Sequence, residues 1–352
     1  MEETNLSSNA SHTVFFEMIH EPFPVRVIRL ALFGVLFLMA VVGNACVFTA
    51  TLRNKKLQTF SYSLITCLSV ADFTSVLGLP FTLVSSQLGS NWIFGSFLCT
   101  LLNPTQVMCG VVTTNVHMSV AVERYMSVIY PFKGKPKGKR KYAVLALIWI
   151  TAVLCAMPAF LNNKVVIYNT NTGRTLNLCV EEFDSYKSRT IYSLFLLSVN
   201  YGTPVLIMAV LYARVILRLR QRSKLRHCMR RHSTNKRRQT IVERKFIKMT
   251  FMIMVLFVMC YLPYQIVFLL IHFDVVPGLA YGFLLYDYAY LVTWLPNAIN
   301  PICYGAMDRL YAKAFRLALG CLVNRTNKLT SSLRMSSYLI KKGSKEKEGS
   351  DG

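Results

Sequence analysis

Residues 30–52 read LALFGVLFLMAVVGNACVFTATL, a run of 23 residues without one charged side chain. A helix needs about 20 residues to cross the hydrocarbon core of a bilayer, so this run is long enough for one crossing. It is too long for the apolar region of a cleavable signal peptide, which has about 7–15 residues. We therefore expect a transmembrane helix here that is retained in the mature chain.

Six further apolar stretches have a similar length, and they cover residues 57–83, 97–129, 142–163, 190–213, 249–273 and 282–307. Hydrophobic residues make up 53% of the 352 residues, charged residues make up 16%, and the mean hydropathy is +0.40. This balance excludes an ordinary soluble or disordered protein. The stretches lack the period-2 alternation of barrel strands. The sequence predicts an all-α membrane protein, a bundle of seven transmembrane helices over residues 30–307.

The net charge of +24 is distributed in a way that favours a membrane over nucleic acid as the partner. Of the 40 Lys and Arg residues, 34 fall in alternate loops and in the C-terminal segment, which the positive-inside rule assigns to the cytoplasm. Residues 1–29 are then extracellular and the C-terminus is cytoplasmic. We expect a multi-pass protein of the plasma membrane whose basic inner face lies against anionic lipid, with no nucleic acid bound.

Modification signals on the expected outer face agree with this topology. Asn5 and Asn9 each begin an N-x-Ser triplet in the extracellular segment, so we expect both to be glycosylated. Cys99 and Cys179 are the only cysteines expected on the outer face, where an oxidising medium favours a disulfide between them. Such a bridge would hold the loop between the fourth and fifth helices over the bundle.

The segment after the seventh helix has two expected parts. A short amphipathic eighth helix is expected over residues 308–321 on the cytoplasmic side. Cys321 at its end is either a palmitoylation site or a plain thiol. Residues 322–352 are polar and basic, and we expect a disordered tail. Phosphorylation of its Ser and Thr residues would add negative charge that a partner protein could recognise.

Polar residues inside the expected spans indicate function. Asp72 lies in mid-span, where a carboxylate costs about 2.5–3.5 kcal/mol on insertion scales, so it should face inward and hold a cation or a proton. Arg124, at the cytoplasmic end of the third span, reads by itself as an interfacial anchor. Glu243 is the only acid of the basic third inner loop, and it could pair with Arg124 as a latch between two helices. Three prolines inside the later spans are expected to kink their helices: Pro204, Pro263 and Pro301.

The order of several short motifs resembles the rhodopsin-type (class A) G-protein-coupled receptors over about residues 25–321. The matching residues are Gly43-Asn44, Leu68 to Asp72, Trp92 to Gly95, Cys99, Glu123-Arg124-Tyr125, Trp149, Pro204, Tyr212, Phe257, Cys260 to Pro263, and Asn300-Pro301-Ile302-Cys303-Tyr304. Each motif is weak alone, but the ordered set in seven spans is specific. The chain departs from the usual pattern at Glu123, where Asp is commoner, at Tyr261, where Trp is usual, and at Pro296-Asn297, where Asn-Ser is usual.

The resemblance implies roles for two groups of residues inside the bundle. An inner sodium and water site would be formed by Asp72, Thr113, Asn297 and Asn300, and no other cofactor is expected. Arg124 would move from Glu243 toward a heterotrimeric G protein, with Tyr212 and Tyr304 supporting the open state. The other residues of this activation group are Glu123, Tyr125, Phe257, Tyr261, Pro263 and Pro301.

The resemblance also narrows the ligand class. The seventh span has no lysine for a retinal Schiff base, and Gln106 stands where receptors for biogenic amines have Asp. Gln106, Leu79–Leu83 and the Trp92–Gly95 loop are similar to neuropeptide receptors of the neuropeptide Y and RFamide kind. By position in the family, the pocket candidates are Gln106, Gln265, Phe268 and Tyr290. Three acids would give the outer mouth a rim that suits a short basic peptide, although they also fit a solvated loop: Glu181, Glu182 and Asp287.

Two other functions remain open at this stage. A transporter could use Asp72 as an ion site, but transporters usually contain two matching halves, and no two parts of this chain match. A receptor active without a ligand, or with a non-peptide ligand, would fit the departures at Tyr261 and Pro296. An enzyme is not expected, because the six histidines are scattered without metal-ligand spacing and no Gly-rich phosphate loop occurs.

Overall fold

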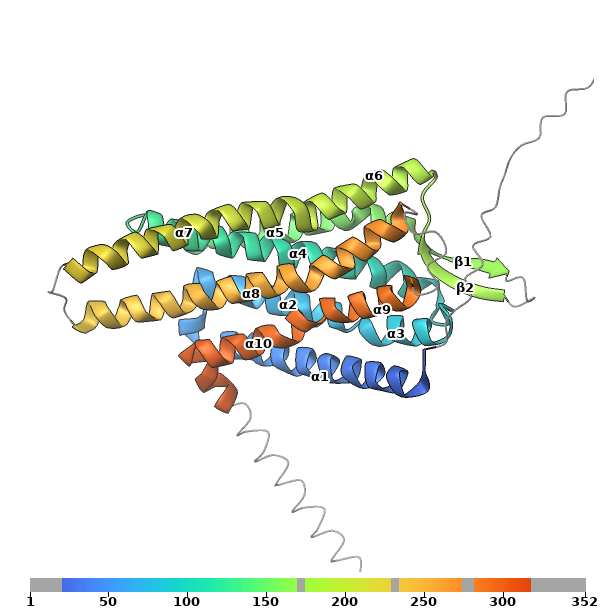
Figure 1. Cartoon of the computed structure of the whole chain (residues 1–352), viewed down its shortest axis with the longest axis horizontal. Helices are drawn as coiled ribbons and strands as arrows, with labels where there is room; N and C mark the ends of the chain where they lie inside the picture. Colours follow the sequence, from blue (N-terminus) through green and yellow to red (C-terminus); the bar gives the residue numbers. More distant parts are fainter. Residues whose placement is uncertain (1–20, 170–174, 229–233, 274–281, 318–352) are drawn as a thin grey trace, which may run out of the picture.

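The computed structural model describes residues 21–169, 175–228, 234–273 and 282–317 (Figure 1). The α-helices are α1 (Phe23–Arg53), α2 (Phe60–Val76), α3 (Leu79–Gln87), α4 (Gly95–Ile129), α5 (Gly138–Asn162), α6 (Tyr186–Leu197), α7 (Thr203–Cys228), α8 (Thr234–His272), α9 (Gly282–Thr293) and α10 (Leu295–Met307). A 3-10 turn covers Lys55–Leu57, a π-helical turn covers Ser198–Gly202, and residues 309–317 are also helical. The strands β1 (Asn163–Asn169) and β2 (Thr175–Glu181) form an antiparallel hairpin.

The helices lie side by side along one long axis, with the hairpin at one end (Figure 1). We call this the hairpin end, and we call the opposite end, where α4 finishes just after Arg124, the Arg124 end. Six helical segments in the described part of the chain are long and apolar enough to cross a membrane, and they cover Phe23–Arg53, Phe60–Gln87, Gly95–Ile129, Gly138–Asn162, Tyr186–Gln221 and Lys245–Leu270. The seventh crossing is made by α9 and α10 in succession. The chain is therefore a multi-pass membrane protein, as the apolar runs predicted.

The outer surface of the bundle is apolar. On α5, for example, Leu147, Ile150 and Leu154 each expose more than half of their side chain. A soluble protein rarely exposes so many large apolar side chains in a band, so this surface faces lipid acyl chains. The polar side chains of the spans point inward instead, where Asn44, Asp72 and Asn300 are each no more than 1% exposed.

Three of the crossings are interrupted at places that the chain chemistry explains. The second ends as α2 before Gly78 and continues as α3, whose first turn contains Pro80. The fifth passes through the π-helical turn just before Pro204, which has no backbone N–H to donate. The seventh breaks at Trp294, two residues before Pro296. By contrast, α8 remains helical through Pro263.

The first helix begins at Phe23, seven residues before the expected span at Leu30. Pro24 lies in the first turn, where its missing N–H costs nothing. Arg29 does not end the helix, because its guanidinium is buried against Glu21 and Asp287. The span expected from the sequence starts just after the charged residue Arg29. That start is too late along the chain, because partners neutralise Arg29 and the helix continues through it.

The expected eighth helix is present as the helical residues 309–317, within the expected range 308–321. Asp308 begins it, because its Oδ1 accepts a hydrogen bond from the Leu310 backbone N–H at 2.8 Å. The Tyr62 hydroxyl donates to the other carboxylate oxygen at 2.6 Å. The fully buried Tyr311 then packs this segment onto the bundle.

The first and seventh crossings touch where Gly43 faces Pro301. A Cβ atom at residue 43 would lie 2.8 Å from both Pro301 Cβ and Cγ. A proline ring is part of the backbone and cannot rotate away, so the two helices approach this closely only because residue 43 is glycine.

Gly43→Ala should therefore lower the thermal stability of the purified protein by about 1–3 kcal/mol, the usual cost of overpacking. The measurement is the midpoint of thermal unfolding in detergent. Gly34→Ala on the same helix is the matched control, because a Cβ there meets nothing within 4 Å. Equal midpoints for the two variants would contradict the close contact.

Candidate functional site

The hairpin is fixed over the bundle by a disulfide and by hydrogen bonds. Cys99 at the start of α4 is bonded to Cys179 of β2, as the sequence predicted. On the same helix, the Thr100 hydroxyl donates to the Asn163 carbonyl at 3.2 Å. The backbone N–H of Trp92 donates to the Asn177 carbonyl on β2 at 2.6 Å. These links set the position of β2 and of the acids that follow Cys179.

Aromatic side chains from α8 and α9 form one cluster at the hairpin end. The Tyr264 ring lies 5.4 Å from Tyr286, 6.2 Å from Tyr290 and 6.4 Å from Phe268. The Tyr264 and Tyr286 hydroxyls are 3.1 Å apart, within hydrogen-bond distance. Tyr290 then contacts Trp294 edge to face at 5.6 Å, at the break of the seventh crossing. Of these five residues, the sequence had pointed only to Phe268 and Tyr290.

Gln106 of α4 joins this cluster through its carboxamide. The Tyr290 hydroxyl donates to Gln106 Oε1 at 3.3 Å. The amide nitrogen Nε2 is buried and has no hydrogen-bond partner among the described residues. It approaches Gly78 so closely that a Cβ there would lie 2.6 Å away. Gln265, the fourth expected pocket residue, is half-buried on α8 next to Tyr264.

The three expected acids occupy three different environments. Glu182 is half exposed and pairs with Lys164 across the hairpin at 3.0 Å. Glu181 is largely buried, and this burial raises the pKa of its carboxyl, although a hydrogen bond with Asn163 and the charge of Arg189 oppose the rise. Asp287 is bound by Arg29 at 2.7 Å. The acids therefore do not form a single free rim.

Arg29 is the centre of an ion cluster that the sequence reasoning missed. Its guanidinium is 5% exposed and contacts Glu21 at 2.8 Å and Asp287 at 2.7 Å. The Tyr288 hydroxyl donates to Glu21 at 2.7 Å, and the Ser86 hydroxyl donates to Asp287 at 3.1 Å. The cluster ties the segment before α1 to α3 and α9. An arginine at the start of an otherwise uncharged run was the available signal.

The ion cluster around Arg29 lowers the pKa of the Glu21 carboxyl. Burial alone would raise its pKa, but hydrogen bonds from Arg29 and Tyr288 and the charge of Arg29 outweigh burial, so the pKa lies below its usual value. A carboxyl with a lowered pKa stabilises the folded state above its ordinary pKa. That contribution is lost as the pH falls toward the folded-state pKa.

A second buried site surrounds Asp72. Asn300 Nδ2 donates to Asp72 Oδ2 at 3.1 Å, and Asn44 Nδ2 donates to the Asn297 carbonyl at 2.9 Å. Thr113 and Asn297 are also buried, on α4 and α10. The oxygens Asn44 Oδ1 and Asn300 Oδ1 have no hydrogen-bond partner among the described residues. Asn300 is in direct contact with Asp72, and a carboxylate with buried amide oxygens is chemistry that suits a small hard cation such as sodium.

At the other end of α4, the Glu123 carboxylate binds two cations. Arg124 contacts it through Nε and Nη2, and Lys135 Nζ lies 2.8 Å from Oε1. The Ser61 hydroxyl donates to Glu123 at 2.9 Å and accepts from Arg124 at 3.0 Å. Arg124 also lies over the Phe246 ring, 4.4 Å from its centre. Lys135 and Ser61 were missed, because only the folded chain brings them to Glu123.

The remaining activation residues line the interior between these sites. Phe257 contacts Tyr261 on one side and His117 on the other, with ring centres 4.6 and 4.9 Å apart. Tyr212 is buried in the same cluster as Phe257, and Tyr304 is buried in a second cluster nearer the Arg124 end. The rest are placed as follows: Pro301 against Gly43, Pro263 on the exposed face of α8, and Tyr125 beside Tyr130.

Several expected residues lie outside the described part of the chain. These are Asn5, Asn9, Cys321, the tail from residue 322, and the side chain of Glu243. The latch between Arg124 and Glu243 therefore stays a prediction, as do the modifications.

Arg29→Gln should lower the thermal unfolding midpoint by roughly 5–10 °C, because it leaves the buried Glu21 carboxylate and the partly buried Asp287 carboxylate without their cation. Arg26→Gln, at an exposed site one turn earlier, is the control and should lower the midpoint less, because Arg26 acts on Glu21 through its charge without an ion-pair contact. For the wild-type chain the midpoint should fall as the pH drops below about 4–5, the ordinary range of a glutamate. A midpoint equal in the Arg29 and Arg26 variants would exclude a stabilising role for the cluster.

Comparison with known proteins agrees with this arrangement. The chain matches the family described as 7 transmembrane receptor (rhodopsin family) over residues 43–304. It is 28% identical to a QRFP-like peptide receptor of Branchiostoma floridae, over 86% of this chain and 80% of that protein. It is 27% identical to neuropeptide Y receptor type 6 of Oryctolagus cuniculus (88% and 85%) and 28% identical to the substance-K receptor of Bos taurus (90% and 81%).

The match covers the Asp72 and Arg124 sites and the second to sixth crossings, but it leaves out residues 23–42 of α1, with Arg29, and the last residues of α10. It includes the Asp72 site, the Arg124 site, and the disulfide that fixes the hairpin. The chain belongs to the rhodopsin family of 7-transmembrane receptors, and it is a G-protein-coupled receptor, not an enzyme.

Proposed function

We propose that this receptor binds a short, amide-rich basic peptide at the hairpin end and signals to a heterotrimeric G protein at the Arg124 end. In this proposal the hairpin end faces the outside of the cell at the plasma membrane, because most Lys and Arg residues fall at the opposite end. The relatives that the chain matches include receptors named for a QRFP-like peptide, neuropeptide FF, neuropeptide Y and substance K. Those names support a peptide as the ligand class.

The observation that carries the proposal is the unpartnered amide nitrogen of Gln106. A buried donor without an acceptor costs roughly 1–3 kcal/mol, and a ligand carbonyl could remove that cost. The neighbouring Tyr264, Tyr286 and Tyr290 offer ring faces and hydroxyl groups. Peptides present the matching chemistry, since they have a carbonyl at each residue.

The charges at the hairpin end favour a basic ligand. Glu181 is largely buried and lies on β2 two residues after the disulfide-bonded Cys179, within electrostatic range of Tyr264 and Tyr286 of the aromatic cluster. A cationic ligand side chain placed there would relieve the burial of its carboxylate. Asp287 is already neutralised by Arg29, so a ligand cation would have to compete for it. We therefore assign the main contact with a cationic ligand group to Glu181. Glu182 and Asp287 make secondary contacts at the edge of the site.

The inner contacts offer a route for the signal. Ligand contact with Tyr290 would act on Trp294 at the break in the seventh crossing, and contact with α8 would act on Tyr261 and Phe257. Arg124 would then leave Glu123 and bind the G protein. A receptor kinase and an arrestin would end the signal at the tail, which lies outside the described residues.

The Asp72 site would hold a sodium ion in the inactive receptor. Asp72 would supply the charge, and Asn44 Oδ1 and Asn300 Oδ1 are buried oxygens that could complete its shell. Thr113 and Asn297 would contribute through their side chains or through water.

In cells, short amidated peptides that contain arginine should cause G-protein dissociation through the wild-type receptor. Gln106→Leu should raise the half-maximal peptide concentration at least about tenfold, because a buried hydrogen bond is lost and an acceptor on the peptide is left unpaired. Gln58→Leu is the matched control and should keep the wild-type potency, because the Gln58 carboxamide donates to the Thr51 and Leu52 carbonyls at the Arg124 end, away from the peptide. Arg124→Ala should abolish the signal while peptide binding persists.

If the receptor is detected at the cell surface but no peptide causes G-protein dissociation, the peptide proposal is wrong. A peptide response that is unchanged in Gln106→Leu would leave the ligand class standing but would reject this site. Measuring bound labelled peptide beside the signal separates the two outcomes.

Sodium chloride should raise the thermal unfolding midpoint of the purified receptor relative to potassium chloride at equal ionic strength, by about 2–4 °C for each kcal/mol of binding. Asp72→Asn should remove this difference, because the carboxylate charge is gone. A sodium effect that survives in Asp72→Asn would place the ion elsewhere.

A further inference from the structure

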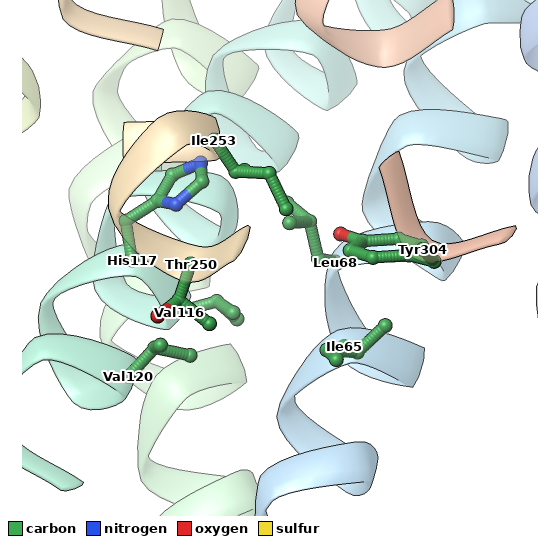
Figure 2. Close-up of a pocket in the computed structure, with 8 residues that line it drawn as sticks. All are labelled: Ile65, Leu68, Val116, His117, Val120, Thr250, Ile253 and Tyr304. Atoms are coloured by element: carbon green, nitrogen blue, oxygen red, sulfur yellow. The ribbon is translucent and has the colours of Figure 1, made fainter. Parts of the chain in front are cut away.

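A small cavity lies among α2, α4, α8 and α10, between the Asp72 site and the Arg124 site (Figure 2). Its lining residues are Ile65, Leu68, Val116, His117, Val120, Thr250, Ile253 and Tyr304. Leu68 precedes Asp72, and Val120 precedes Arg124, by about one helical turn in each case. Its volume accessible to the centre of a water molecule is about 20 Å³, enough for about one water molecule.

Two polar atoms in this lining have no partner. His117 Nε2 and the Tyr304 hydroxyl are both buried without a hydrogen bond to any described residue. The side chains are only 5% and 1% exposed, so lipid or bulk water does not satisfy them. Figure 2 shows them on opposite sides of the cavity, with the Tyr304 hydroxyl pointing inward.

A third polar group can contribute. The Thr250 hydroxyl donates to carbonyls of its own helix, to Phe246 and Ile247 at 3.1 Å each, and keeps the capacity to accept one bond. The other five lining side chains are aliphatic. An all-apolar cavity of this size would stay dry, whereas one with two or more polar partners retains water.

We propose that this cavity is a water-binding site, in which His117 and Tyr304 hold bound water between α4 and α10. Tyr304 donates to the water, and the water donates to His117 Nε2 or, in the other tautomer, accepts from it. Thr250 provides a further acceptor from α8. The site is distinct from the Asp72 site, whose polar groups lie one turn nearer the hairpin end.

The bound water gives His117 a defined role. Its ring packs on Phe257, which in turn contacts Tyr261, so the imidazole joins the aromatic column to the water. The water extends the polar contacts from the Asp72 level across an otherwise aliphatic layer toward Arg124. The water then holds Tyr304 of α10 to His117 of α4. This role does not depend on which ligand the receptor binds.

The test is a double-mutant cycle on the thermal unfolding midpoint of the full receptor without ligand. Tyr304→Phe should lower the midpoint by about 2–4 °C in the wild-type background, because the water loses its donor. In the His117→Leu background the water is already absent and the Tyr304 hydroxyl is buried without a partner, so Tyr304→Phe should no longer lower the midpoint and should leave it unchanged or raise it. The shared water is the source of this coupling.

Tyr62→Phe is the matched control. Its hydroxyl binds Asp308 instead, so its effect on the midpoint should be the same in both backgrounds. His117→Met replaces His117→Leu if the latter does not fold, and the same coupling is expected. Equal effects of Tyr304→Phe in the two backgrounds would overturn the proposal.

A direct measurement uses an experimental density map in which ordered water is visible at the Asp72 site. A density peak within hydrogen-bond distance of His117 Nε2 or the Tyr304 hydroxyl, absent in His117→Leu, is the expected result. An empty cavity in the wild-type map would overturn the proposal.

Discussion

Lipid acyl chains can neither donate nor accept a hydrogen bond, and this constraint organises the whole molecule. Every backbone amide in a crossing must bond within its helix, and every polar side chain must find a partner inside the bundle. The polar side chains of the interior accordingly gather in a few sites, around Arg29, Asp72 and Glu123. Between these sites the helices meet through aliphatic and aromatic side chains.

The crossings themselves could be predicted from the sequence, because the hydropathy of a stretch is the sum of its residues and does not depend on the fold. A helix that crosses lipid must contain about 20 apolar residues, and no tertiary contact changes that requirement. The disulfide was predictable for a similar reason, since Cys99 and Cys179 were the only two cysteines expected on one face. The interruptions were harder. Pro80, Pro204 and Pro296 lie beside the three interruptions, but a proline alone does not fix where a helix ends, since α8 continues through Pro263.

The partners of the charged residues could not be predicted, because each depends on segments far apart in the chain. Asp287 looked like a free acid at the mouth, yet Arg29, 258 residues earlier, neutralises it. Lys135 looked like one basic loop residue among many, yet it shares the Glu123 carboxylate with Arg124. The sequence identified which residues carry charge, and the fold decided which of those charges remain available to a ligand or a G protein.

The break at Trp294 divides the seventh crossing into two short rods, α9 and α10, joined at one residue. The first rod holds Tyr286 and Tyr290 in the aromatic cluster, and the second holds Asn300 and Tyr304 among the inner polar groups. A continuous helix would pass any tilt at one end to the other as a lever does. The turn at Trp294 keeps its hydrogen bonds, from its N–H to the Leu291 carbonyl and from the Ala298 N–H to its carbonyl, so a change in the angle between α9 and α10 can be absorbed at this one turn while each helix keeps its own bonds.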